Sequence, residues 1–158
     1  SNGIDNVTFQ IETNKGSGFE SIEKIASGGE LSRIMLAIKV SLSSDIGDLN
    51  TRKTLIFDEV DTGVGGAVAD AIGKRLLLLG TNNQVLAVTH HPQVAARSNN
   101  HFKVNKSTNN SFTSTSIINL ELKERIEEVA RMLSGEKVTD AARNAAESLF
   151  INSNSLWI

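Results

Sequence analysis

The chain has 158 residues, of which 39% are hydrophobic and 22% are charged, and its net charge at pH 7 is −2. This balance excludes an overall basic field of the kind that attracts nucleic acid, and the absence of cysteine excludes disulfides, thiolate metal sites and cysteine nucleophiles. A chain of this length can bury roughly 70% of its unfolded surface, so we expect a single domain over 1–158. The uninterrupted apolar runs are too short to span a bilayer, and we expect a cytoplasmic protein without a membrane partner. The opening Ser1-Asn2-Gly3 is compatible with a short cloning remnant that precedes a domain taken from a longer chain.

Periodicity and turn residues predict the elements in chain order. Alternating apolar residues predict a strand at Val7–Thr13, followed by a turn at Lys15–Phe19. Helical spacing predicts helices from Gly28 to about Ser43, from about Val68 to Gly80, and around Ile126–Leu133. Short apolar runs predict buried strands at Thr54–Phe57 and Gln84–Val88, and two later strands at His101–Asn105 and Phe112–Ile118. A polar connection is expected at Asp45–Arg52, and Thr139 is expected to cap a last helix.

The order of the middle elements indicates the fold class. Strand, helix, strand and helix follow one another from Thr54 onward, which favours an α/β fold with a mainly parallel sheet and flanking helices. In such sheets ligands bind at the carboxyl ends of the strands. Asp58, Glu59 and His90 all follow directly on predicted strands, so we expect them at that edge.

Two adjacent acids follow the first of these strands. An apolar strand that ends in Asp58-Glu59 suits a magnesium–phosphate site, in which the first carboxylate holds Mg²⁺ through its oxygen atoms. The second carboxylate can orient and deprotonate a water that attacks a phosphoryl group. Considered alone, two solvated acids at a strand end are an equally good interpretation.

The segment Ser27-Gly28-Gly29-Glu30 precedes a predicted helix. S-x-x-E ahead of an apolar run is a capping box, and a capping role alone is the better interpretation of the segment in isolation. Two glycines in a first helical turn are nevertheless costly, by up to about 1 kcal/mol each. Exposed backbone N–H groups at a helix N-terminus suit an anion such as a γ-phosphate, and both roles can coexist.

Loop residues around these motifs offer further candidates. His90 could polarise a phosphate oxygen, although a lone loop histidine more often lies on the surface; His91 receives no role. Asp61 and the glycine-bearing stretch Thr62–Gly66 form either a plain loop or a backbone that approaches nucleotide or a second subunit. A zinc site is disfavoured because no H-x-x-x-H spacing occurs. No G-x-x-x-x-G-K-[ST] loop occurs either, so the predicted site lacks a phosphate cradle.

In combination, these motifs resemble the ABC-type ATPase heads of the SMC-like family over about 7–150. Ser27–Arg33 (SGGELSR) is similar to the ABC signature motif, Thr54–Glu59 (TLIFDE) to a Walker B strand, and Val88–His90 to the switch-histidine loop. The family's head has two lobes separated in sequence by a long coiled-coil hairpin. This chain resembles only the C-terminal lobe, so the resemblance implies a partner lobe that carries Walker A.

The resemblance also implies cofactors, partners and residue roles. Two heads sandwich ATP and Mg²⁺, and the complete protein acts on DNA in double-strand break repair, in the cytoplasm at the nucleoid. Asp58 would bind Mg²⁺, Glu59 would be the general base and His90 would contact the γ-phosphate. Residues Ser27, Gly28, Gly29 and Glu30 would reach nucleotide on the opposing head, and Asp61 would line the interface between heads. Gly65 stands where many heads of the family carry an interface aspartate.

Two other classes of function stay open at this point. The chain could belong to another ABC or SMC-like ATPase, such as a transporter subunit. A long heptad-patterned segment ahead of this domain in the parent chain would support an SMC-like head, whereas a short linker would indicate a transporter. It could also be an interaction module without catalysis, although such a module needs neither Glu59 nor His90.

Overall fold

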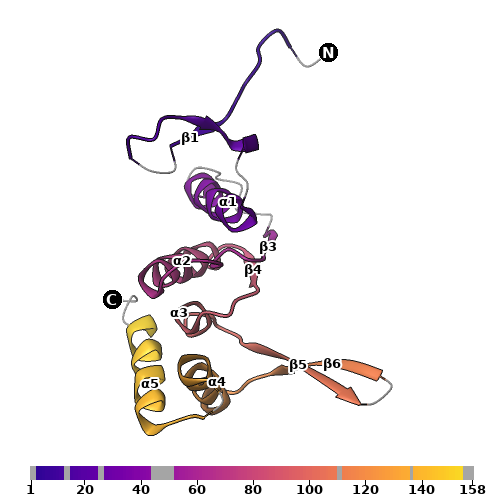
Figure 1. Ribbon diagram of the computed structural model, residues 1–158, viewed down its shortest axis with the longest axis vertical. Helices are drawn as coiled ribbons and strands as arrows, with labels where there is room; N and C mark the ends of the chain where they lie inside the picture. Colours follow the sequence, from indigo (N-terminus) through magenta and orange to yellow (C-terminus); the bar gives the residue numbers. More distant parts are fainter. Residues whose placement is uncertain are drawn as a thin grey trace.

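The computed structural model describes residues 3–12, 15–24, 27–43, 52–109, 112–135 and 137–154. Five α-helices, a short 3₁₀ helix and six strands lie within these ranges (Figure 1). The helices are α1 (Gly28–Ser43), α2 (Gly66–Leu79), α3 (Pro92–Ala95), α4 (Leu122–Ser134) and α5 (Asp140–Asn154), and the 3₁₀ helix is η1 (Ile22–Lys24). The strands are β1 (Gln10–Ile11), β2 (Glu20–Ser21), β3 (Thr54–Phe57), β4 (Gln84–Ala87), β5 (Phe102–Asn109) and β6 (Phe112–Asn119).

β3 and β4 form the parallel pair that the sequence predicts. Thr54 lies opposite Gln84 and Phe57 opposite Ala87, and α2 is the crossover helix between the two strands. The ladder extends one residue further, since the Val88 N–H donates to the Phe57 carbonyl oxygen at 2.9 Å. Both strands therefore deliver the segments that follow them to the same edge.

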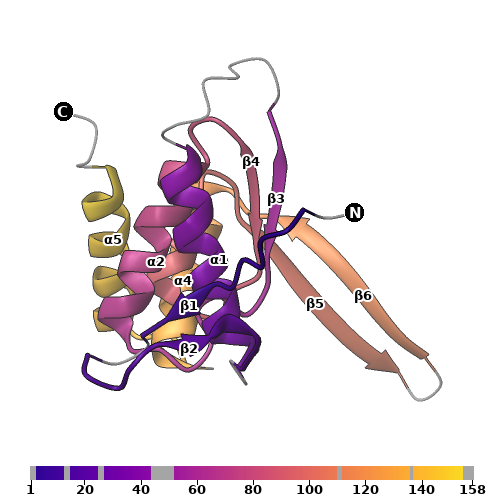
Figure 2. The same ribbon diagram turned by 90° about the horizontal axis from the view of Figure 1, so that it is seen from above.

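The first hydrophobic core joins α1, α2 and α3 to one face of this pair. Figure 2 shows α1 and α2 together on one side of β3 and β4. Leu79 is 1% exposed and Val60 is fully buried, and burial of such a side chain contributes about 1.5–3 kcal/mol. The core comprises Leu36, Val40, Phe57, Val60, Ala69, Ile72, Leu76, Leu79 and Val94.

The opposite face of the parallel pair is uncovered, which the sequence did not predict. We expected buried strands, yet Ile56 is 71% exposed, Val88 62% and Leu86 44%. Side chains alternate between the faces of a strand, so only those of Leu55, Phe57 and Val85 pack on the helices. A short apolar run cannot reveal whether both faces are covered by the same chain.

A second core lies between α3, α4 and α5. Small side chains such as Ala130 and Ala146, both fully buried, allow the helices to approach closely. The predicted cap of the last helix is confirmed, because the Ala142 N–H donates to Thr139 Oγ1 at 3.2 Å. The core comprises Ala95, Ala96, Val129, Ala130, Ala142, Ala146 and Phe150.

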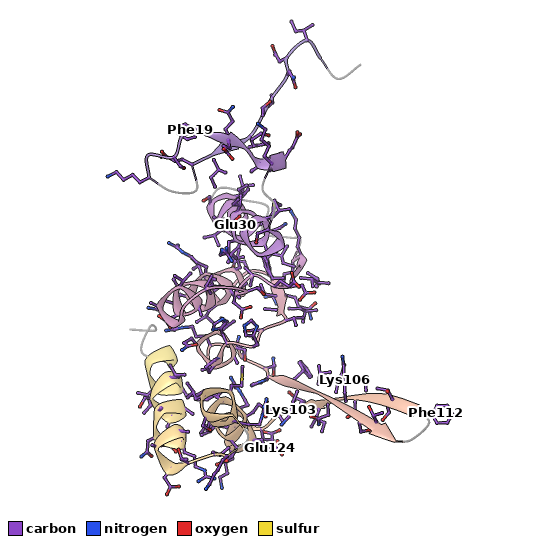
Figure 3. All side chains as sticks on the ribbon, viewed as in Figure 1. Phe19, Glu30, Lys103, Lys106, Phe112 and Glu124 are labelled. Atoms are coloured by element: carbon purple, nitrogen blue, oxygen red, sulfur yellow. The ribbon has the colours of Figure 1, made fainter. Side chains whose placement is uncertain are left out.

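β5 and β6 form an antiparallel hairpin that projects from the helices (Figure 1). We call this hairpin the arm. Its strands are longer than predicted, and every residue of β6 is exposed. Figure 3 places Phe112 at the far end of the arm and Lys103 near its base.

The predicted α/β class is confirmed, with a qualification on strand direction. Among the described residues β3–β4 is a parallel sheet, whereas β1–β2 and the arm are antiparallel. The strand predicted at Val7–Thr13 shortens to Gln10–Ile11, because Val7 and Phe9 are 78% and 68% exposed and have no core to pack against. The predicted connection at Asp45–Arg52 lies, apart from Arg52, outside the described residues. No helix in the described ranges is both long and apolar enough to cross a membrane.

Candidate functional site

Asp58 and Glu59 lie directly beyond the carboxyl end of β3. Their neighbours Phe57 and Val60 are buried in the first core, so the backbone is anchored on both sides of the two acids. Both acidic side chains are themselves exposed. Within the described part of the chain neither carboxylate takes part in an ion pair or a hydrogen bond, so both are available to a ligand.

The backbone at Glu59 is unusual. Its φ of +59° lies in the left-handed region, and Glu59 is the one non-glycine residue of the described ranges with a positive φ. Such a conformation costs about 1–3 kcal/mol and persists where the surroundings enforce it. Here the Thr62 N–H donates to the Glu59 carbonyl oxygen at 3.1 Å, and Ser32 Oγ donates to the Asp58 carbonyl oxygen at 3.2 Å. Nothing in the sequence indicated this strain.

The N-terminus of α1 packs against this turn. Ser27 Oγ accepts a hydrogen bond from the Glu30 N–H at 3.4 Å, so Ser27 forms its half of the predicted capping box. Arg33 Nη1 donates to the Thr62 carbonyl oxygen at 3.1 Å and ties the first turns of α1 to the loop after the acids. Figure 3 labels Glu30 on α1.

The two glycines of α1 have different surroundings. A Cβ at Gly29 would lie 3.3 Å from the Glu59 carbonyl oxygen and 3.4 Å from that of Thr62, which is tighter than ordinary packing. Gly29 therefore permits the close approach of α1 to the acidic turn. A Cβ at Gly28 would lie 3.5 Å from Glu59 Oε2, an ordinary contact. Packing among the described residues therefore does not require a glycine at position 28.

His90 follows β4 on the neighbouring strand of the pair. It is exposed, and its ring centroid lies 4.5 Å from that of His91. His91 precedes α3, whose first residue is Pro92. The parallel pairing thus brings the segment with His90 to the same edge as Asp58 and Glu59, as the sequence predicts.

Asp61 is buried, whereas the role predicted from the sequence calls for contact with nucleotide or with a second head. Its side chain is 1% exposed and Oδ2 accepts a hydrogen bond from Thr89 Oγ1, so in this structure the carboxyl group is directed into the chain. Burial follows from the turn at Glu59, which directs the chain back toward the core. Thr89 was not singled out from the sequence, although a hydroxyl residue between a strand and a histidine pair was the available signal.

The acids fit a magnesium ion that is bound mainly through substrate and water. No group of three or more His, Cys, Asp or Glu side chains within the described ranges is arranged to hold a metal. Mg²⁺ commonly takes one or two carboxylates, several waters and the phosphates of its substrate, and the exposed carboxylate of Asp58 matches that requirement. The site thus defines an α/β lobe that presents two acids, a histidine and a helix N-terminus around one sheet edge.

The sequence relatives of this lobe are DNA repair proteins. The chain is 46% identical over 147 residues to the DNA repair protein RecN of Rickettsia bellii, 47% over 148 residues to that of Xylella fastidiosa, and 45% over 147 residues to that of Bacillus subtilis. These matches cover 93%, 94% and 93% of this chain but only about a quarter of each relative, at 26%, 26% and 25%. The chain is thus similar to a segment of RecN over nearly its whole length.

No protein-family model matches the chain. One solved structure, described as "Structural biochemistry of ATP-driven dimerization and DNA stimulated activation of SMC ATPases", is 16% identical with a TM-score of 0.49, over 77% of this chain and 70% of that one.

Proposed function

We propose that the chain is the C-terminal lobe of an ATP-hydrolysing head in a RecN-like DNA repair protein. One observation carries this proposal: the loop after β3 with two exposed acids, the loop after β4 with an exposed histidine, and the glycine-rich N-terminus of α1 meet at the carboxyl edge of a parallel strand pair. The similarity to DNA repair proteins named RecN supports the biological setting.

Each side chain of this edge receives a role that its surroundings support. Glu59 accepts the proton of the water that attacks the γ-phosphate, and its anchored backbone fixes the direction of attack. His90 donates a hydrogen bond to a γ-phosphate oxygen. Asp58 holds a magnesium ion, which when bound neutralises charge on the phosphates.

The N-terminus of α1 binds phosphate held by a second head. Its first turn offers the backbone N–H groups of Gly28 and Gly29 and the positive end of the helix dipole. Gly28 keeps this approach open, since no contact with the residues that the structure describes requires a glycine there. In this arrangement Ser27, Gly28, Gly29 and Glu30 contact nucleotide across a homodimer of heads.

A second lobe is needed to complete the site. The sequence has no loop that cradles phosphates, and the uncovered face of β3–β4 exposes Ile56, Leu86 and Val88. Apolar patches of this kind mark surfaces that another protein segment covers. The proposed occupant is the N-terminal lobe with the Walker A loop, and DNA is engaged through the complete protein.

The test measures ATP binding and hydrolysis by the chain alone, by a Walker A lobe of a RecN relative alone, and by their mixture. Turnover is expected only in the mixture. Robust hydrolysis by the chain alone would contradict a half-site. Absence of any nucleotide response in the mixture, with both lobes folded, would instead favour an interaction module.

Glu59→Gln in the mixture tests the catalytic assignment. Loss of a general base is expected to lower turnover by about 100-fold or more, while ATP stays bound and the heads stay engaged. Glu147→Gln is the matched control, because Glu147 is exposed on α5. Turnover of the Glu59→Gln variant within a few-fold of normal would remove Glu59 from the role of base.

A further inference from the structure

The loop after β3 and the loop after β4 are joined by a short chain of hydrogen bonds. Thr89 Oγ1 donates to Asp61 Oδ2, and the same hydroxyl oxygen accepts from the His91 N–H at 2.9 Å. Asp61 lies two residues after Glu59, and Thr89 immediately precedes His90. One threonine hydroxyl therefore connects the segment of the proposed base to the segment of the proposed phosphate contact.

The Thr89 hydroxyl acts both as a hydrogen-bond donor and as a hydrogen-bond acceptor. A threonine O–H donates one hydrogen bond and its oxygen can accept others. By donating to a carboxyl oxygen while it accepts a backbone N–H, Thr89 fixes the direction of the chain between Val88 and Pro92. Pro92, which is buried, restricts the same segment from its other end.

Burial of the Asp61 carboxyl group costs free energy, which the hydrogen bond from Thr89 offsets in part. Its side chain is 1% exposed, and Oδ1 is a buried atom without a hydrogen-bond partner among the described residues. An apolar residue would fill this position without leaving a polar atom unsatisfied. Packing alone therefore does not account for an aspartate at position 61.

We propose that Asp61 and Thr89 are positioning residues, which hold the His90 loop in register with the Glu59 loop. This inference rests on the proposed ATPase function. Neither residue touches the reacting atoms in this arrangement. Thr89 holds the backbone on both sides of His90, and Asp61 supplies the fixed acceptor that orients Thr89. The pair keeps a phosphate contact on one strand aligned with a base on the next.

The first experiment measures amide hydrogen exchange by NMR on this chain. Thr89→Val removes the hydroxyl at nearly constant shape, and exchange at His91 is expected to become about tenfold faster, as for loss of one hydrogen bond. Thr89→Ser keeps the hydroxyl and should restore slow exchange. Thr81→Val is the matched control, since Thr81 Oγ1 donates to the Leu78 carbonyl oxygen at the opposite end of the strand pair. Unchanged exchange at His91 in Thr89→Val would overturn the proposal.

The second experiment measures ATP turnover in the mixture with a Walker A lobe. Thr89→Val is expected to lower kcat by about tenfold or more with the KM for ATP changed less than about twofold, because positioning of catalytic groups acts on the reaction step. Thr89→Ser should recover most of kcat, and Thr81→Val should retain it. A merely structural role would lower the melting temperature of Thr89→Val and leave kcat unchanged at lower temperature, which would also overturn the proposal.

The two experiments separate failure of this inference from failure of the proposed function. If the unsubstituted mixture hydrolyses ATP and Thr89→Val is equally active, the ATPase proposal is supported and the positioning role of Thr89 is contradicted. If the unsubstituted mixture does not hydrolyse ATP, the ATPase proposal is contradicted. The positioning role is then contradicted as well, whatever the rate of amide exchange at His91.

Discussion

The parallel pair β3–β4 and the arm differ in how their backbones are fixed. β3 and β4 have four residues each, yet one face is sealed against the first core by Leu55, Phe57 and Val85. The arm has strands of eight residues, but β6 is exposed along its entire length. The candidate catalytic residues all follow the short, half-buried strands. Precise placement of side chains depends on burial of the backbone that carries them, rather than on the length of a sheet.

The two regions also differ in how they meet the rest of the chain. The loops beyond β3 and β4 are held by several bonds from α1 and from each other. At the base of the arm, Lys103 reaches Glu128 on α4 at 2.5 Å. Toward its tip the arm carries paired hydroxyl side chains, such as Ser107 with Ser114 at 2.7 Å. It therefore has local order without a core of its own.

A charge on the uncovered face of β3 should give the largest effect outside the catalytic residues. Ile56→Lys is expected to weaken association with a Walker A lobe by about 100-fold or more, because an unpaired charge would be buried in the joint sheet. The stability of this chain alone should change little, since Ile56 is 71% exposed. Association can be measured by titration calorimetry and stability by thermal unfolding.

Leu133→Lys is the control for this substitution. Leu133 is 39% exposed on α4, and the charge is introduced away from the parallel pair. It should leave association unchanged. Equal association of Ile56→Lys and the unsubstituted chain would show that this face of β3 is not where the second lobe binds.

The two glycines of α1 provide a smaller and sharper comparison. Gly29→Ala is expected to destabilise the chain by about 1–3 kcal/mol, because its Cβ would crowd the carbonyl oxygens of Glu59 and Thr62. Gly28→Ala should be neutral or stabilising by up to about 1 kcal/mol, because alanine favours the helix and meets only ordinary contacts. Urea unfolding of both variants measures the difference. Equal stability of the two variants would contradict the close approach of α1 to the acidic turn.

Much of the framework could be predicted from the sequence, because local patterns encode it. Helical spacing located α1 correctly, and the alternation of strand and helix predicted the parallel direction of β3 and β4. The carboxyl-edge rule then placed Asp58, Glu59 and His90 together. Each of these inferences uses neighbours in sequence or a general rule of topology.

The remaining features depend on contacts that no local pattern encodes. The left-handed φ of Glu59 arises from bonds to Thr62 and to α1, and the burial of Asp61 follows from that turn. The uncovered face of β3–β4 was not predicted, because a short apolar run such as Thr54–Phe57 has the same sequence pattern whether one face of the strand or both faces are covered. Tertiary packing decided these points, and the sequence pattern was compatible with either outcome.

The weakest expected effect concerns the ion pairs at the base of the arm. Burial raises the pKa of Glu128, but hydrogen bonds from Arg131 and Lys103 outweigh it, and the pKa lies below its ordinary value of 4.5. A depressed carboxyl pKa contributes stability above the unfolded value, and this contribution is lost as the pH falls below 4.5 through the folded pKa. Arg131 is 48% exposed and Lys103 32%, so solvent screening limits the contribution to about 1 kcal/mol.

Glu128→Gln should therefore lower the free energy of unfolding by about 1 kcal/mol at neutral pH, and by progressively less as the pH falls below 4.5 through the depressed folded pKa of Glu128. The stability of the variant should depend less steeply on pH in this acid range. Glu127→Gln is the neighbouring control, because Glu127 is 52% exposed and pairs with the partly exposed Arg143. Urea unfolding at neutral pH and at a series of pH values below 4.5 measures both variants. If Glu128→Gln and Glu127→Gln lost the same stability at neutral pH, the arm would be held to α4 by packing and backbone pairing, and the buried carboxylate would contribute nothing specific to its attachment.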